Sequence, residues 1–468
     1  MSTLQRLEKL ATAHKLELDG VPSASVALLE DGKITSSLIG NGDGDIDTVY
    51  QACSISKAIT ALAVAKLIDE GKFTYDTRVI DHLPADTIGL MTEPSTTHLM
   101  QHVTVRMLLS HTSGLSQGGF PGYSQKPATA HEVLAGTAPA NTPKVRFQSF
   151  PGAHWSYSGG GFTVLQLFLE QIMGRSFVEI MQDVVLRPLK MSRSHYGPLP
   201  AAETNYASAH FTAHVCADAE YHTFAELAAA GLWTTPADLL RAVSAVQESL
   251  HSTSGFLKKD TAFEMLTMAP QDSGDMFMAL GWAADHSVFA HRGGNEPGYR
   301  CYVLGSHGGT VNPKAGAEAS QLPPRRGVAV MTNSVEGFRA VQMIVGAIYY
   351  LQGWPRFETL PCGFGKPDFV PYAVSDGAIA DAGWRQWVGQ WEGGWCLKED
   401  GGQPALAFEG FRPMRLLPAA MSVEPEEHSL VVEGLRVAVR LTFKSKERAI
   451  ELVQPGGGKM LHRISRLC

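Results

Sequence analysis

The sequence predicts an α+β protein in which an antiparallel sheet is flanked by helices, followed by a small β-barrel-like domain at the C-terminal end. Three observations lead to this fold class. Extended segments occur near the start of the chain and again between residues 275 and 334, strongly apolar helical segments lie between them, and residues 384–468 hold only short extended runs.

The bulk composition allows a compact globular enzyme, and it favours a small molecule as the partner. The chain has 468 residues, of which 44% are hydrophobic and 18% charged, and this length predicts one large domain plus a smaller one. A net charge of -7 without a basic run makes nucleic acid and anionic membranes poor partners. The composition leaves the oligomeric state open.

The N-terminal residues carry no apolar stretch of the kind found in secretory signals, and no run of 18 apolar residues occurs. We therefore expect a cytoplasmic protein that does not enter the membrane. The cysteines are scattered without metal-ligand or disulfide-framework spacing, so we expect free thiols, no metal and no cofactor. Their positions are Cys53, Cys216, Cys301, Cys362, Cys396 and Cys468.

The first predicted elements are a hairpin and a buried helix. Residues 22–29 and 34–40 read as strands joined at Asp31-Gly32, a pair that favours a tight turn. The apolar run at 58–72 reads as a helix that ends at Gly71. Ser54 therefore lies where an extended segment meets a helix.

Further helices and strands complete the large domain. Helices are predicted within 103–115, over 160–174 and over 237–250, the last after the N-cap Thr235. Extended segments follow, and together they predict an antiparallel sheet; their positions are 275–285, 287–294, 299–305 and 326–334. A helix at 336–352 closes the domain.

The predicted domains are a catalytic domain at 1–353, a linker at 354–383 and an all-β domain at 384–468. The linker carries four prolines and no periodicity. Residues 305–326 are rich in Gly and Pro and longer than a hairpin needs, so we expect an insertion. Four tryptophans are expected to fill the core of the small domain, and they are Trp384, Trp387, Trp391 and Trp395.

The first chemical constellation is Ser54-Ile55-Ser56-Lys57. Residues three apart lie on one face of a helix, so the Ser54 hydroxyl and the Lys57 amine can meet. A serine needs a base to become nucleophilic, and a lysine screened from water can act as that base. The helix N-terminus also offers backbone N–H groups to a developing oxyanion.

Two later segments supply further candidates. The loop Tyr157-Ser158-Gly159 offers a phenol for proton transfer, and His291-Arg292-Gly293-Gly294 places a histidine before a glycine-rich segment. Each segment alone has an ordinary structural explanation. His111 is interpreted as a turn residue bonded to backbone rather than as a catalytic group.

The combination of motifs over residues 20–350 resembles the serine β-lactamase and penicillin-binding-protein superfamily, in particular class C β-lactamases, D-peptidases and the related esterases and transacylases. The resemblance is carried by SISK at 54–57, LLSHTSGL at 108–115, the YSG loop, AGLWTTPADLLR at 230–241 and HRGGNEPGY at 291–299. It implies an α/β sandwich with an all-helical subdomain.

The resemblance also implies roles for individual residues. Ser54 would form an acyl-enzyme, while Lys57 and Tyr157 share the general-base and general-acid work. Backbone N–H groups of Ser54 and Gly294 would bind the oxyanion. The other residues expected to line the substrate site are His291, Gly293, Ser158 and Gly159.

Two departures from the family pattern bear on the substrate. Gly159 stands where many relatives have an asparagine that recognises an amide, and His291 stands where β-lactamases have a lysine. Arg292 or Arg300 could replace that lysine's charge. Because both departures are frequent among the family's esterases and acyltransferases, the resemblance favours a carboxylic-ester hydrolase or transacylase.

Two alternatives stay open from sequence. The first is a β-lactamase or a D-amino-acid peptidase or amidase of the same fold. The second is a non-catalytic binding module descended from the family, although Ser54, Lys57 and Tyr157 are all present.

Overall fold

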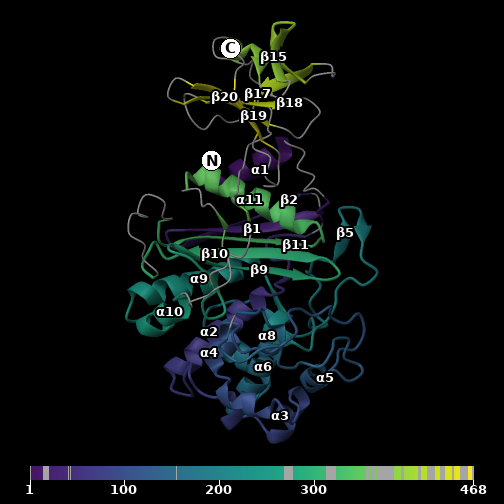
Figure 1. Cartoon of the computed structure of the whole chain (residues 1–468), viewed down its shortest axis with the longest axis vertical. Helices are drawn as coiled ribbons and strands as arrows, with labels where there is room; N and C mark the ends of the chain where they lie inside the picture. Colours follow the sequence, from purple (N-terminus) through teal and green to yellow (C-terminus); the bar gives the residue numbers. More distant parts are fainter. Residues whose placement is uncertain are drawn as a thin grey trace. The chain divides into compact units, whose positions relative to one another are not determined.

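A computed structural model shows the architecture of the chain (Figure 1). The structure describes residues 2–13, 20–40, 42, 44–153, 155–267, 278–311, 323–354, 359–360, 364–365, 384–391, 395–408, 413–418, 427–432, 438–444, 447–453 and 462–465. Residues 312–322 of the predicted insertion, and the predicted linker at 354–383 except for residues 354, 359–360 and 364–365, lie outside these residues.

The chain divides into two compact units. One unit comprises Glu17–Val341 and Pro361–Gly363, and it contains every candidate site residue. The other comprises Met1–Leu16, Gln342–Leu360 and Phe364–Cys468. Each unit is described by itself below.

The larger unit is built on a six-stranded antiparallel sheet, as the sequence predicts. In spatial order the strands are β2 (Lys33–Gly40), β1 (Ser23–Glu30), β11 (Arg326–Thr332), β10 (Tyr299–Ser306), β9 (Val288–Asn295) and β8 (Ala283–Ala284). The predicted hairpin is confirmed, because Glu30 pairs with Lys33 across Asp31 and Gly32, which both have positive φ.

The strand predicted at 275–285 is much shorter than expected. Residues 275–277 are not described, and the remainder forms only β8. Gly281 explains the break, because it has φ +78° and a Cβ there would lie 2.3 Å from the Cβ of Ala61. The chain therefore approaches the central helix closely instead of continuing as a strand.

Helices pack on the sheet and form a cluster beside it (Figure 1). Helix α9 (Pro236–His251) contacts β1, β10 and β11, and α2 (Ile55–Asp69) contacts β9 and β10. Helix α9 begins at the predicted N-cap, since the Thr235 hydroxyl accepts the Asp238 N–H. The clustered helices are α3 (Ala85–Met91), α4 (Val105–Leu109), α5 (Ala130–Ala135), α6 (Gly159–Met173), α7 (Phe177–Met181), α8 (Leu227–Ala230) and α10 (Lys259–Leu266).

Shorter elements connect the sheet to the helices. They are the three-stranded sheet β3 (Tyr50–Gln51), β7 (Leu232–Thr234) and β4 (His195–Tyr196), the hairpin β5 (His210–Thr212) and β6 (Val215–Cys216), the 3₁₀ helices Val79–Asp81 and Thr97–His102, and the π-helical turn Gln182–Leu186. Helix α11 (Gly337–Gln352) spans the division between the units.

The second unit contains α1 (Thr3–Ala13) and an eight-stranded antiparallel meander. Its strands are β14 (Gly389–Trp391), β15 (Trp395–Asp400), β16 (Gln403–Phe408), β17 (Met414–Pro418), β18 (Glu427–Val432), β19 (Ala438–Lys444), β20 (Glu447–Val453) and β21 (His462–Ser465), after a 3₁₀ helix at Trp384–Trp387; a further pair is β12 (Thr359–Leu360) with β13 (Phe364–Gly365).

The meander is not a closed barrel in the part of the chain that the structure describes, because its end strands β14 and β21 do not pair with each other there. Its core contains three of the four predicted tryptophans, Trp384, Trp387 and Trp391, with the half-buried Trp395 packed against them. The Trp391 indole N–H donates to the Trp387 carbonyl at 2.9 Å.

Candidate active site

Ser54 lies at the start of helix α2, and its hydroxyl does not cap the helix. It has helical dihedral angles and makes no side-chain cap bond. The preceding Cys53 has φ +53°, a left-handed conformation that turns the chain sharply into the helix. Ala52, one residue earlier, is held by a 2.8 Å bond from its N–H to the Leu232 carbonyl. The hydroxyl of Ser54 is therefore available for other partners.

The amine of Lys57 is one of those partners. Its Nζ donates to Ser54 Oγ at 3.2 Å and to the Ala229 carbonyl at 2.8 Å. The side chain is buried, and burial lowers the pKa of Lys57 to about 7, because the charged form loses its hydration. The neutral amine beside the Ser54 hydroxyl is therefore accessible near neutral pH.

Aromatic rings enclose this amine. The Lys57 Nζ lies 5.0 Å from the centre of the Tyr157 ring and 5.8 Å from that of Phe162. The structure thus brings Ser54 and Lys57 together, as their three-residue spacing predicts, and it places the ring of Tyr157 beside the same amine. These rings exclude water from the amine, which is the physical reason for its low pKa.

His111 fixes the loop that carries Tyr157. Its Nδ1 accepts the Ser158 N–H at 3.1 Å, its carbonyl accepts the Ser156 N–H at 2.9 Å, and its ring packs 4.4 Å from the Tyr157 ring. Burial, together with the Lys57 charge, holds the pKa of His111 well below its ordinary value. The predicted backbone bonding of His111 is therefore present, and it positions the tyrosine.

His291 lies on β9 as a buried, neutral group. Its Nδ1 donates to the Arg292 carbonyl at 2.7 Å, and burial followed by the charge of Lys57 lowers the pKa of His291 to about 3. A neutral imidazole therefore stands at the position where the sequence resemblance implies a lysine in the β-lactamases. Because Nδ1 carries the single ring proton, Nε2 can accept a hydrogen bond.

Gly293 allows β9 to lie directly against the nucleophile segment. A Cβ on Gly293 would fall 2.5 Å from the Ala52 carbonyl oxygen and 2.8 Å from the Cys53 Cβ. Gly294 faces the other side, where a Cβ would meet Arg300 Cδ at 3.3 Å. The close approach at 293 requires glycine, whereas Gly294 offers its backbone with less steric constraint.

Ser158 and Gly159 form the start of α6. The Ser158 hydroxyl donates to the Ser116 carbonyl at 3.1 Å and accepts the Gly161 N–H at 2.8 Å, so it is committed to capping the helix. A Cβ on Gly159 would lie 2.7 Å from Cε2 of Phe120. The position where relatives carry asparagine is thus crowded by an aromatic ring.

Neither nearby arginine replaces the lysine of the β-lactamases. Arg292 follows His291 on a strand, so its side chain points to the opposite face, where it is exposed. Arg300 is buried, and its guanidinium donates to the backbone carbonyls of Asn295 and Tyr299 and to the carboxylate of Glu296. The sequence alone could not separate these directions.

The Ala229 carbonyl and the Phe162 ring are site components that sequence reasoning missed. The Ala229 carbonyl is 172 residues from Lys57 in the chain, and any residue type could supply a backbone carbonyl there, so the sequence gives no signal for it. Phe162 reads in the sequence as an ordinary apolar residue of α6, and only its position beside Lys57 distinguishes it.

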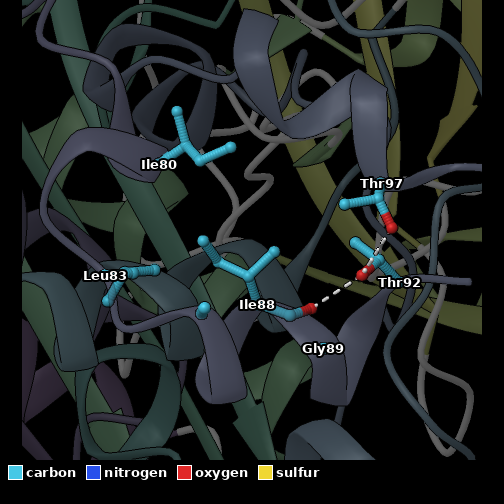
Figure 2. A pocket seen from close by; sticks show the side chains of 7 residues that line it. Ile80, Leu83, Ile88, Gly89, Thr92 and Thr97 are labelled. Carbon is cyan, nitrogen blue, oxygen red and sulfur yellow. Dashed lines mark hydrogen bonds between the residues drawn. The ribbon is translucent and has the colours of Figure 1, made fainter. Parts of the chain in front are cut away.

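None of these residues lines the pocket of about 340 Å³ that Figure 2 shows. Its lining is formed by Ile80, Leu83, Ala85, Ile88, Gly89, Thr92 and Thr97. The Thr92 hydroxyl donates to the Ile88 carbonyl at 2.9 Å, so its proton is already engaged in a hydrogen bond within the protein. The pocket contains no candidate nucleophile or base.

Within the described ranges, no three His, Cys, Asp or Glu side chains gather as metal ligands would. Among the helices of those same ranges, none has the length and apolar character needed to cross a bilayer.

Comparison with known proteins gives relatives along much of the chain. Residues 11–346 match the β-lactamase family. Penicillin-binding protein 4 of Amycolatopsis lactamdurans is 29% identical over 212 residues, which cover 44% of this chain and 51% of that protein. Protein flp of Staphylococcus aureus strain MW2 is 25% identical, covering 42% of this chain and 38% of its own length. The chain thus spans about half or less of these relatives.

Solved structures share the fold. D-amino acid amidase from Ochrobactrum anthropi SV3, in complex with L-phenylalanine amide, aligns with a TM-score of 0.58 at 17% identity, over 75% of this chain and 99% of that one. A class C β-lactamase mutant aligns with a TM-score of 0.55 at 18% identity, over 75% and 97%. With the family match over most of its length, the chain belongs to the β-lactamase family, within the serine β-lactamase and penicillin-binding-protein superfamily.

Proposed function

We propose that this protein is a serine hydrolase that forms an acyl-enzyme on Ser54 and acts on a small carboxylic ester, releasing the acyl group to water or to another acceptor. The observation that carries the proposal is the 3.2 Å contact between the Ser54 hydroxyl and a buried Lys57 amine. No cofactor is required for this chemistry.

The mechanism follows from the state of the amine. With the pKa of Lys57 near 7, a neutral Nζ accepts the Ser54 proton while Oγ attacks the substrate carbonyl. The ring of Tyr157 lies 5.0 Å from the same amine, and its phenol is proposed to share the proton transfer to the leaving alcohol. Backbone N–H groups of Ser54 and Gly294 are proposed to hold the oxyanion.

The charge of the site supports an ester rather than an acidic substrate. His291 is neutral, Arg292 points to the other face of β9, and Arg300 is engaged with backbone carbonyls and Glu296. A substrate carboxylate would then find no permanent cation on the face of β9 that carries His291. An uncharged ester needs none.

The crowding at Gly159 supports the same preference. A side chain that could hydrogen-bond a substrate amide has no room at this position while the Phe120 ring stays in place. A buried polar group of an amide or lactam substrate would lose a partner there, at a cost of about 1–3 kcal/mol.

Side-by-side assays test this preference. We expect the highest kcat/KM with a nitrophenyl ester, and much lower values with a chromogenic cephalosporin and with a D-alanyl nitroanilide. Ser54→Ala should abolish all three activities. A dominant lactam or amide rate would replace the esterase proposal with the β-lactamase or amidase alternative, and the absence of any Ser54-dependent turnover would favour a binding module.

Adding a short alcohol separates hydrolysis from acyl transfer. If the acyl-enzyme partitions to an alcohol, the ratio of new ester to free acid will rise with alcohol concentration while nitrophenol release stays constant or increases. If water alone is accepted, the free acid will account for all of the nitrophenol.

A further inference from the structure

We propose that Phe120 sets the substrate size limit of this enzyme by filling the space beside the Tyr157 loop, so that the site takes small, uncharged, apolar groups. This inference rests on the proposed function, because it concerns which ester reaches Ser54. It starts from the contact between the Phe120 ring and Gly159.

The loop at 117–120 lies against the start of α6. The Gly160 N–H donates to the Gln117 carbonyl at 3.0 Å. A Cβ on Gly118 would be 3.5 Å from the Tyr157 carbonyl, and a Cβ on Gly159 would be 2.7 Å from Cε2 of Phe120. The aromatic ring is thereby held beside the segment that carries the proton-transfer tyrosine.

Glycine at 159 has no backbone explanation. Its φ is not in the left-handed region, so a residue with a side chain could adopt the same conformation. Glycine also costs about 1 kcal/mol in a helix relative to alanine. The close approach of Phe120, together with the carbonyls of Gln117 and Gly118 at 3.2 and 3.3 Å, accounts for the missing Cβ.

Phe120 is placed to meet a substrate because it is only half-buried. Ser54 and Tyr157 are half-buried too, whereas Ser158 and Gly159 are buried. One side of Phe120 packs on the core of the helical cluster and on the small cluster around Tyr123. The remaining surface is apolar and flat, so it favours an uncharged apolar group over a polar one.

A double-mutant cycle with two ester series tests the proposal. One series varies the acyl group with a constant nitrophenol, from acetate to benzoate. The other varies the alcohol of acetate esters, from methyl to benzyl. We expect Phe120→Ala to raise the bulky-to-small kcat/KM ratio about 10-fold in at least one series, which is the scale on which pocket contacts discriminate.

The second substitution of the double-mutant cycle is Gly159→Ala, which is made in the parent and in Phe120→Ala. Gly159→Ala should lower kcat/KM at least 10-fold in the parent, because the new methyl group displaces the ring. In the Phe120→Ala background the same change should cost several-fold less, since the clash with the ring is gone and only the Gln117 and Gly118 carbonyls at 3.2 and 3.3 Å remain. Equal effects of Gly159→Ala in both backgrounds would overturn the assignment.

The controls keep the outcomes distinct. Phe150→Ala removes a phenylalanine that is 70% exposed and should leave every ratio unchanged. Phe120→Leu provides a milder variant if the alanine protein is unstable, and ratios measured on one preparation do not depend on the active fraction. If the parent shows Ser54-dependent ester turnover but Phe120→Ala changes neither series, the inference fails alone; if no ester is turned over, the proposed function fails.

Discussion

The Nζ of Lys57 lies one helical turn from Ser54, with 3.2 Å between it and the serine Oγ, and it is anchored from the other side by the Ala229 carbonyl. The carbonyl fixes the direction of the amine, and burial removes part of its affinity for a proton. The pair is therefore arranged for proton transfer before any substrate arrives.

The pH dependence of the reaction tests the role of this amine. Lys57 must be neutral to accept a proton, and its pKa lies at about 7, so kcat/KM should rise as the pH increases through that value and level off above it. Stopped-time ester assays from pH 5 to 9 measure the profile. Lys57→Arg, which stays protonated throughout, should be nearly inactive at every pH; a parent profile that is flat or falls over this range contradicts the base assignment.

His111 should act as a positioning residue for the tyrosine loop. His111→Ala removes the acceptor of the Ser158 N–H and leaves a buried donor unpaired, which costs about 1–3 kcal/mol of stability. We expect kcat to fall about 10- to 100-fold with a smaller change in KM, because Tyr157 loses its support.

The matched variant for that experiment is His111→Asn. Asparagine offers a carbonyl oxygen near the lost Nδ1 and tolerates the positive φ of 58° at this position. It should recover a large part of both kcat and thermal stability. Identical behaviour of the alanine and asparagine variants would show that the acceptor is unimportant.

The two glycines of β9 should respond differently to alanine. Gly293→Ala places a methyl group 2.5 Å from a backbone carbonyl and should abolish activity or folding. Gly294→Ala meets only the Arg300 and Phe338 side chains at 3.3 Å or more and keeps its backbone N–H, so activity should fall less than about 10-fold. Circular dichroism and ester assays on both proteins compare their folding and activity. A folded, active Gly293→Ala protein would contradict the prediction.

Glu226 should make the stability of the larger unit depend on pH. Burial raises the pKa of its carboxyl to about 7, so the folded state binds the proton more tightly than the unfolded state. The free energy of unfolding should therefore decrease as the pH rises from about 4.5 to 7, by up to about 3 kcal/mol relative to Glu226→Gln.

Denaturant unfolding of both proteins at several pH values checks this prediction. Glutamine cannot ionise, so the difference between the two proteins should grow toward pH 8 and close toward pH 4. Parallel curves across the range would mean that the Glu226 carboxyl is not buried in the folded protein.

Local features of this fold could be predicted from the sequence, and long-range ones could not. The Asp31-Gly32 turn, the Thr235 cap and the pairing of Ser54 with Lys57 each depend on residues within four positions of one another. The segment around Gly281 was predicted as a strand because its break depends on contact with Ala61, about 220 residues earlier in the chain.

The candidate site shows the same division. The motifs indicate which residues take part, but the charge state of Lys57 depends on burial by Tyr157 and Phe162, and the directions of Arg292 and Arg300 depend on strand alternation and on Glu296. The contacts of Lys57 with Tyr157 and Phe162 join segments about 100 residues apart, so they could not be predicted from local sequence.

Intact mass spectrometry of the protein during turnover tests the central claim most directly. After brief incubation with a slowly released nitrophenyl ester and acid quench, the parent should gain the mass of one acyl group, and Ser54→Ala should gain none. An equal adduct on Ser54→Ala would contradict the assignment of Ser54 as the nucleophile, as would steady Ser54-dependent turnover without any covalent adduct under single-turnover conditions.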